Sequence, residues 1–380
     1  VGVVFKLICA YEERILGRKR KDAAIEIFSR FADLVAIGTI ADVMPIVDEN
    51  RVIVMYGLER INCTERKGLS ALIEASVSGN ARPVAQGAKE KPKKKINSSF
   101  IGFGIAPRIN AAGRISNASK AVELFLTDSS EKAQDIAREL CDINRQRQVE
   151  ENRIAEQAYK TIEQEHDFEN DRVIVLSDDN WQQGIVGIVA SRVTEKYGLP
   201  SIFVSFDGAT RGYPAADDIG KGSGRSIKGM NLVEALNYCS EYLVKYGGHE
   251  LAAGFTISRS SIPEFRRQIC QLAAGYYRED IPRTSLEIDC TIQPELLTIA
   301  GIDSLSALEP CGNGCPKPVL MMKDLQIERL NMVGGGRHMR LRLRRGRYGF
   351  NAIYFSATPE STSVAVGDTV DIAFVPQVNE

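Results

Sequence analysis

The feature that most limits the possible folds of this chain is a long polar segment with helical spacing, residues 130–166. It is dense in Glu, Gln, Arg and Ala and has few apolar positions, which favours a helix that bridges two lobes over one that fills a core. A new alternation of apolar and polar residues begins after Asp171. We therefore expect a domain boundary near that residue, in a chain whose 380 residues allow two or three domains.

Strand and helix patterns alternate beyond this boundary, which predicts an α/β layer structure. The expected strands are Arg172–Leu176 and Ser201–Ser205, and the expected helices are Gly187–Tyr197 and Leu232–Val244. A Gly-Ser-Gly-Arg-Ser segment, residues 222–226, is expected in the loop between the second strand and the second helix.

From about Pro282 the pattern changes to short strands separated by Gly-rich turns, and an OB-like barrel fits the size of this module. The expected strands are Leu286–Ile292, Met339–Arg344, Phe350–Phe355 and Thr369–Phe374. Arg340, Arg342 and Arg344 alternate with leucines, so one face of a strand pair is basic. That face is either a track for single-stranded nucleic acid or an ordinary solvated surface.

The first part of the chain is expected to contain helices over residues 4–16, 22–31, 51–62, 68–76 and 119–126. The apolar run Leu34–Asp42 predicts a buried strand that carries Asp42 at its carboxyl end, where open α/β sheets place their ligands. A turn or helix-capping aspartate is the alternative for Asp42. The lysine-rich segment Lys89–Lys95 is expected to be a solvated insertion.

Three glycine-containing segments are candidates for phosphate binding. Gly247-Gly248-His249 precedes a run of small residues, and glycine lets the backbone approach a ligand closely. Alternatively, Gly247 ends the preceding helix and His249 packs beneath a strand. The other two segments are residues 222–226 and Pro107–Arg114, whose Arg108 and Arg114 either converge on a phosphate or form structural ion pairs.

Composition adds few constraints. The net charge of −1 confines any nucleic-acid site to local basic clusters. We expect no membrane association, because no apolar run is long enough to span a bilayer. Eight scattered cysteines favour reduced thiols in the cytoplasm, and Cys311 and Cys315 have no second pair that would indicate zinc. The chain starts at Val1 as if within a domain, so we expect that its natural N-terminus is missing.

Four motifs in order resemble the RecJ family of single-stranded-DNA exonucleases, within the DHH phosphoesterase superfamily. They are GTIADVMPI around Asp42, PRINAAGR at 107–114, GSGRS at 222–226 and GGHELAAGF at 247–255. The segment Leu308–Pro318 resembles the one that leads into the family's OB domain. The resemblance implies an α/β fold: the C-terminal part of a DHH domain (1–127), a connecting helix (128–170), a DHH-associated substrate-binding domain (171–281) and an OB-like domain (282–380), whose completeness it leaves open.

The resemblance implies 5′-to-3′ hydrolysis of single-stranded DNA in repair and recombination, with two ions of Mn²⁺ or Mg²⁺ in the complete enzyme. It places Asp42 at the metals, Arg108 or Arg114 on a non-bridging phosphate oxygen, and His249 near the scissile phosphate. The implied substrate-binding residues are Asn110, Ser223, Arg225, Ser226, Gly247, Gly248, Arg340, Arg342 and Arg344. A monomer is expected, with a helicase or a single-strand-binding protein as candidate partners.

The chain also departs from the family pattern. The Asp-His-His motif is absent, and with only three histidines and no adjacent pair we expect this chain alone to be inactive. Gln182 follows Trp181 where a histidine is common, and Cys311 and Cys315 stand where Phe and Asn are common. The alternatives are an inactive single-stranded-DNA-binding or scaffold relative, or a DHH phosphodiesterase acting on short oligonucleotides or cyclic dinucleotides.

Overall fold

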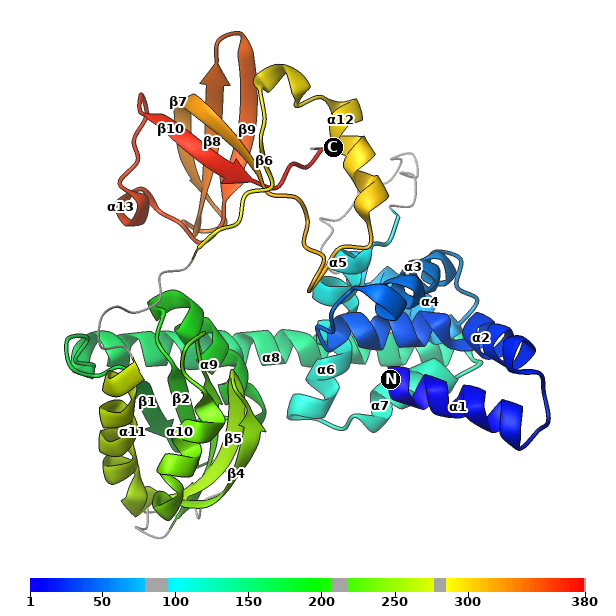
Figure 1. Cartoon of the computed structure of the whole chain (residues 1–380), viewed down its shortest axis with the longest axis horizontal. Coiled ribbons are helices and arrows are strands. Elements are labelled where there is room, and N and C mark those ends of the chain that lie inside the picture. Colours follow the sequence, from blue (N-terminus) through cyan, green and yellow to red (C-terminus); the bar gives the residue numbers. More distant parts are fainter. Residues whose placement is uncertain (79–94, 207–217, 277–284, 379–380) are drawn as a thin grey trace. The chain divides into compact units, whose positions relative to one another are not determined.

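The computed structural model of the chain describes residues 1–78, 95–206, 218–276 and 285–378 (Figure 1). The chain forms two compact units. Unit 1 combines residues 1–63, 93–102 and 285–380, and unit 2 combines residues 64–92 and 103–284.

Helices make up the first part of unit 1, and they confirm the predictions over residues 4–16, 22–31 and 51–62. They are α1 (Gly2–Arg14), α2 (Arg20–Ala41), α3 (Asp48–Asn62) and the single turn α5 (Ser98–Phe100). α2 packs against both α1 and α3, and Phe5, Ile27, Val35 and Ile53 form a core between these helices.

The prediction of a buried strand over Leu34–Asp42 is wrong, because α2 continues to Ala41. The apolar run is buried on the helix faces that α1 and α3 cover, and a short apolar run does not by itself distinguish a strand from a buried helix. Asp42 is consequently the C-cap residue of a helix, and its N–H donates to the carbonyl of Gly38.

The second part of unit 1 is a sheet with strand order β10-β7-β8-β9, in which β6 also pairs with β7. Three of these strands, β8, β9 and β10, match predicted strands to within two residues at each end, but the expected strand over 286–292 is reduced to β6, and β7 was not predicted. The elements are β6 (Cys290–Thr291), α12 (Ile299–Ser304), β7 (Leu320–Val333), β8 (His338–Arg345), β9 (Tyr348–Tyr354), α13 (Pro359–Thr362) and β10 (Thr369–Phe374).

Unit 2 begins with helices that pack on the long helix α8, and the prediction over 130–166 is confirmed as a helix. The helices are α4 (Lys67–Ser78), α6 (Ala106–Ile115), α7 (Ser119–Leu126) and α8 (Ser130–Glu165). The expectation that α8 bridges two lobes and does not fill a core needs correction, because α8 buries apolar residues over 133–143 and again over 154–162.

A mixed sheet with strand order β1-β2-β3-β5-β4 forms the rest of unit 2 (Figure 1). Helices α10 and α11 cover one face of this sheet around Phe255 and Phe265, and α8 and α9 cover part of the other face around Trp181 and Phe203. The elements are β1 (Ile174–Asp178), α9 (Gln183–Tyr197), β2 (Ser201–Ser205), β3 (Ile219–Arg225), α10 (Leu232–Tyr238), β4 (Leu243–His249), β5 (Ala252–Ser258) and α11 (Ile262–Tyr276).

The glycine-containing segments at 222–225 and 247–249 both lie in strands. This contradicts the loop predicted for the first segment and the alternative in which Gly247 ends a helix. Residues 222–225 belong to β3, where Gly222 and Gly224 face the core, and an added Cβ at Gly222 would lie 2.1 Å from the Phe255 ring. The second helix ends at Tyr238 rather than near Val244, because the chain from Leu243 pairs with β5. Gly247 therefore does not end a helix.

No helix in the described part of the chain is long and apolar enough to cross a membrane. The basic segment predicted as an insertion, Lys89–Lys95, lies outside the described residues except for Lys95.

We predict that Ile154→Ala lowers the free energy of unfolding of unit 2 by about 2–5 kcal/mol, because the Ile154 side chain of α8 is fully buried. The measurement is urea unfolding followed by fluorescence of Trp181, the single tryptophan of the chain, which is buried in the same core. Ile219→Ala is the control at a site that is 52% exposed, and it should change stability by no more than about 0.5 kcal/mol. Equal losses of stability in the two variants would contradict the burial of the Ile154 side chain.

Candidate functional site

Arg225, at the end of β3, is held against helix α9. Its Nε donates to Ser191 Oγ at 3.1 Å, and its Nη1 donates to Ser223 Oγ at 3.1 Å and to the carbonyl of Gly224 at 2.7 Å. Gly187 of α9 makes this approach possible, because an added Cβ there would lie 2.8 Å from Ser223 Oγ and 3.0 Å from Arg225 Nη2. The fold therefore places the side chains of Ser223 and Arg225 in direct contact, and their role in binding phosphate stays a prediction.

Arg114, on α6, lies in the same electrostatic cluster. Its Nη1 donates to the carbonyl of Gly184 at the start of α9, at 3.2 Å. Partial burial and repulsion from Arg147 lower the pKa of Arg114, and burial and repulsion from Arg114 lower the pKa of Arg225. Guanidinium groups that repel one another in a partly desolvated place form a site suited to an anion.

Arg108 is engaged elsewhere. Its Nη1 donates to the carbonyl of Gly104 at 2.5 Å, and its Nε contacts Cys141 Sγ of α8 at 3.2 Å. Of the two arginines predicted to contact phosphate, the geometry thus favours Arg114. Asn110 lies exposed on α6.

The strand register aligns the glycine-histidine motif with Arg225. Arg225, Ala252 and His249 are paired across β3, β5 and β4, and Ser223, Gly254 and Gly247 form the next row on the same face. Neighbouring strands lie about 4.8 Å apart, so His249 and Arg225 flank a narrow floor of small residues. His249 is exposed on this face, so it does not pack beneath a strand.

Two further predicted residues, Gly248 and Ser226, shape the backbone in this region. Gly248 has a φ of +156°, and an added Cβ would lie 2.4 Å from the carbonyl oxygen of Ala252, so a side chain is excluded there. Ser226 Oγ donates to the carbonyl of Met230 at 2.8 Å and thereby closes the turn before α10.

Asp42 lies in unit 1, unlike the residues above, and its side chain is exposed. The turn that follows it is fixed by the loop of residues 311–315: Asn313 Nδ2 donates to the carbonyl of Val43 at 2.8 Å, and Ile46 N donates to the carbonyl of Asn313 at 2.6 Å. Among the residues that the structure describes, no group of three or more His, Cys, Asp or Glu side chains is arranged to hold a metal ion. These residues therefore do not by themselves form a two-metal centre.

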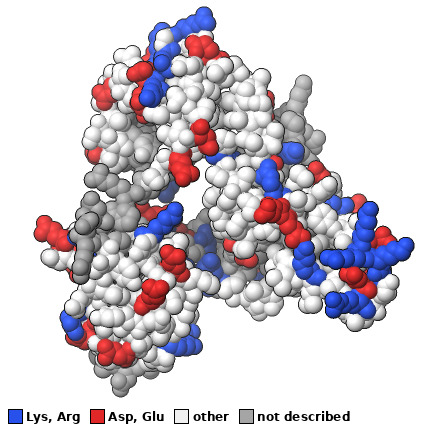
Figure 2. Space-filling model, viewed as in Figure 1, with Lys and Arg blue, Asp and Glu red and all other residues white. Residues whose placement is uncertain are grey.

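The predicted basic face of the OB-like sheet is present on β8. Met339, Leu341 and Leu343 point into the core, so Arg340, Arg342 and Arg344 point outward. Figure 2 shows Lys and Arg side chains gathered at the upper end of this sheet.

These arginines differ in their partners. Arg342 and Arg344 share Glu328, with N–O distances of 3.9 Å and 3.0 Å. Within the described residues, Arg340 has no ion pair or hydrogen bond from its side chain. The Tyr348 ring, a candidate for base stacking, has the guanidinium of Arg347 over it at 5.0 Å.

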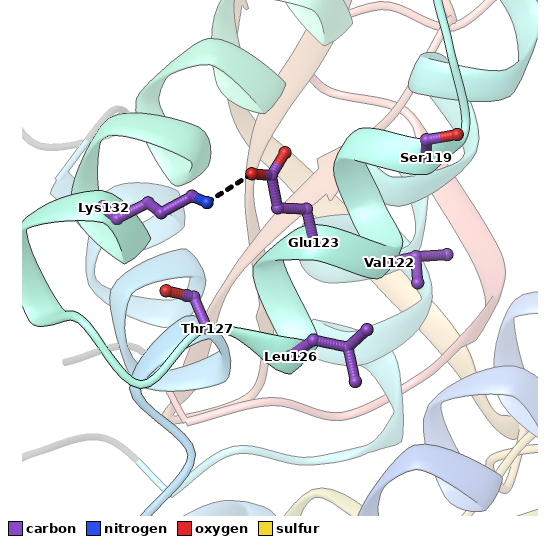
Figure 3. A pocket seen from close by; sticks show the side chains of 6 residues that line it. All are labelled: Ser119, Val122, Glu123, Leu126, Thr127 and Lys132. Carbon is purple, nitrogen blue, oxygen red and sulfur yellow. Dashed lines mark ion pairs between the residues drawn. The ribbon is translucent and has the colours of Figure 1, made fainter.

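A shallow pocket in unit 2 contains none of the predicted site residues (Figure 3). It lies between α7 and the start of α8, with an ion pair between Glu123 and Lys132 at its edge. Its lining residues are Ser119, Val122, Glu123, Leu126, Thr127 and Lys132. We do not assign it to the candidate site.

Sequence reasoning missed three contributors to the arginine cluster. Gly187 and Ser191 are ordinary residues of a helical pattern, so no sequence signal indicates their contact with β3. Arg147 does carry a sequence signal, because it occupies a position of the α8 periodicity at which a buried residue is expected.

Comparisons with known proteins match two domain families to this chain. The DHHA1 domain matches residues 170–275 and the RecJ OB domain matches residues 288–380. Three relatives are each called single-stranded-DNA-specific exonuclease RecJ. The protein from Bacillus subtilis is 31% identical over 100% of this chain, that from Thermus thermophilus is 34% identical over 90%, and that from Escherichia coli is 29% identical over 88%. The chain covers 44%, 45% and 58% of these relatives, so it spans about half their length.

Solved structures agree with the sequence comparison. The crystal structure of RecJ from Thermus thermophilus in complex with Mn²⁺ matches all of this chain with a TM-score of 0.77 at 31% identity, and the chain covers 50% of it. A structure of exonuclease RecJ bound to manganese matches 72% of this chain with a TM-score of 0.53 at 36% identity, and the chain covers 60% of it. Because both domain families, the relatives along the whole chain and the fold agree, this chain belongs to the RecJ family.

Proposed function

We propose that this chain is part of an exonuclease that hydrolyses single-stranded DNA from its 5′ end. The observation that carries the proposal is the cluster in which Arg114 and Arg225 repel each other beside Ser223, because a phosphate group would neutralise these partly buried cations. The names of the relatives support single-stranded DNA as the substrate.

In this proposal the terminal 5′ phosphate binds to Ser223, Arg225 and the Gly248 amide. Arg114 contacts a non-bridging phosphate oxygen, and His249 lies near the scissile or the neighbouring phosphate. The aligned rows of β3, β5 and β4 support this arrangement, since small residues between Arg225 and His249 leave room for a sugar-phosphate backbone. A site that accepts only a terminal phosphate would fix the direction of degradation.

We propose Mn²⁺ or Mg²⁺ as the cofactor of the complete enzyme, with two ions, because RecJ from Thermus thermophilus was crystallised with each metal. Such ions activate a water molecule and stabilise charge on the scissile phosphate. Asp42 is the one residue of this chain that we assign to them. The described residues of this chain do not by themselves form the site for these ions.

The OB-like domain would add affinity along the strand through the outward face of β8. The domain division at residues 127/128, 170/171 and 281/282, a monomeric state, a cytoplasmic location, and a helicase or single-strand-binding protein as partner all stay predictions.

We predict that Arg225→Ala weakens binding of a 5′-phosphorylated single-stranded oligonucleotide to the 380-residue chain by roughly 10- to 100-fold, the cost of one charge-assisted hydrogen bond to phosphate. Fluorescence anisotropy measures the Kd for the phosphorylated strand and for the same strand with a 5′ hydroxyl. Arg267→Ala, at a 66% exposed position on α11, is the matched control and should bind as the parent chain does. Equal losses on both strands would show that Arg225 does not recognise the terminal phosphate.

On the OB-like domain, Arg340→Ala should weaken single-strand binding to a similar extent for every sequence tested. Loss of one phosphate contact should also reduce the slope of log K against log salt by about 0.7. The measurement is a salt titration with oligonucleotides of different sequence, with Arg138→Ala of α8, a 69% exposed site, as the control. An unchanged affinity and slope would remove the β8 face from the DNA path.

The 380-residue chain alone should not digest a 5′-phosphorylated single strand in Mn²⁺, because Asp42 by itself cannot hold two ions. Nucleotide release from a labelled strand measures this. Robust digestion that Asp42→Ala abolishes would contradict the prediction and would show that the chain carries its own metal centre.

A further inference from the structure

Helix α8 carries two charged residues where its periodicity calls for apolar ones. The residues that α8 buries recur every three or four positions on both sides of its middle. Between Ile143 and Ile154 the same face of the helix is occupied by Arg147 and Glu151. Their side chains are only 12% and 14% exposed, so they share the buried stripe and do not extend into solvent.

The contacts of this pair connect α8 to the helix that supports Arg225. Arg147 donates to Glu151 at 2.5 Å and to Asn144 Oδ1 at 3.2 Å. Glu151 also accepts from Arg192 of α9 at 3.1 Å, and the residue before Arg192 is Ser191, the acceptor of Arg225 Nε. Arg147 is therefore held in one orientation, next to the cluster that contains Arg225.

The charges of this cluster do not balance. Arg147 and Arg192 share one carboxylate, Glu151, and Arg114 feels both the repulsion of Arg147 and the attraction of Glu151. Arg225 adds a further cation, and among the described residues its guanidinium donates hydrogen bonds to neutral groups: Ser191, Ser223 and the carbonyl of Gly224. Among these residues four guanidinium groups thus face one carboxylate.

A role in stability alone explains this arrangement poorly. A buried ion pair contributes little net stability compared with apolar residues of similar size. An arginine placed four residues before a glutamate is also the less favourable order on a helix. The same helix uses apolar side chains at equivalent positions on both sides, so the fold does not require charge here.

We propose that Arg147 is a further phosphate-binding residue of the candidate site. Its guanidinium group would contact the sugar-phosphate backbone of the DNA strand beside Arg114. The proposal rests on the proposed function. Glu151 and Asn144 hold the guanidinium in place, so little conformational freedom is lost when a phosphate binds. The polar middle of α8 then belongs to the substrate path, and the apolar stretches on either side serve packing.

The test uses the 380-residue chain and a 5′-phosphorylated single-stranded oligonucleotide, with anisotropy titrations at several salt concentrations. Arg147→Ala should weaken binding by roughly 10- to 100-fold and reduce the log–log salt slope by about 0.7. The matched control is Arg145→Ala, two residues away on the same helix but with a 70% exposed side chain, and it should change neither quantity.

Arg147→Gln covers the case in which the alanine variant does not fold. It keeps a hydrogen-bond donor for Glu151 but removes the charge, so it too should reduce the salt slope. Fluorescence of Trp181 reports whether unit 2 of each variant is folded. A weaker affinity with an unchanged slope would assign Arg147 to structure only and would overturn the inference.

Arg225→Ala separates this inference from the proposed function. If Arg225→Ala weakens binding of the phosphorylated strand and both Arg147 variants bind as the parent chain does, the inference fails and the proposed function stands. If neither arginine matters, the assignment of a phosphate site to unit 2 fails as well.

Discussion

The arrangement of unit 2 depends on one physical constraint: a single helix, α8, has to bury one continuous stripe against different partners along its length. Helix α8 packs on α4, α6 and α7. Toward its C-terminal end it also packs with α9 in the core of unit 2 that contains Trp181 and Phe203, through Ile154, Ala155, Ala158 and Ile162. The positions of α6 and α9 are therefore both set by α8. Arg114 comes from α6, and Arg225 rests on α9 through Gly187 and Ser191.

This arrangement gathers charge at an energetic cost. Burial opposes the protonated forms of both Arg114 and Arg225, and repulsion from Arg147 and from Arg114, respectively, lowers the pKa of each further. An anion bound between them would relieve this repulsion. Ligand binding and folding are then linked, because a ligand that binds only the folded chain stabilises it in proportion to RT ln(1 + [L]/Kd). These cations therefore lower the stability of the folded chain when no anion is bound, and they would contribute to affinity when a phosphate is bound.

Sequence patterns predicted the fold well where periodicity extended over many residues. The helices over 51–62, 119–126 and 130–165 follow from repeats of three and four, and β2 and β10 follow from short apolar runs between turns. The prediction of a strand over Leu34–Asp42 was wrong because this part of helix α2 is enclosed by α1 and α3 and therefore lacks a polar face. The prediction of a loop over residues 222–226 was wrong because glycine usually indicates a turn. Here Gly222 instead lets the Phe255 ring and the β3 backbone approach each other.

The candidate site was predictable residue by residue but not as an assembly. Arg114, Ser223 and Arg225 stand out by chemical type near glycine, and the structure brings Arg114 of α6 and both residues of β3 into contact with α9. The pairing of His249 with the row of Arg225 depends on strand register, and the diversion of Arg108 to Gly104 and Cys141 depends on packing. Neither is encoded in a local pattern, since each depends on segments far apart in the sequence.

In unit 1, the segment that leads into the OB-like domain is held by hydrogen bonds from α3. Arg51 of α3 donates to the carbonyls of Leu308 and Pro310 at 2.9 Å and 2.8 Å, and its Nη1 lies 3.2 Å from Cys315 Sγ. Cys315 therefore offers an acceptor to Arg51. Cys311 is buried, and its carbonyl accepts from Ser98 Oγ at 2.6 Å. Because Asn313 of the same loop binds the carbonyl of Val43, these contacts fix the turn that presents Asp42. The segment that leads into the OB-like domain is thus also the support for the one residue that we assign to the metals.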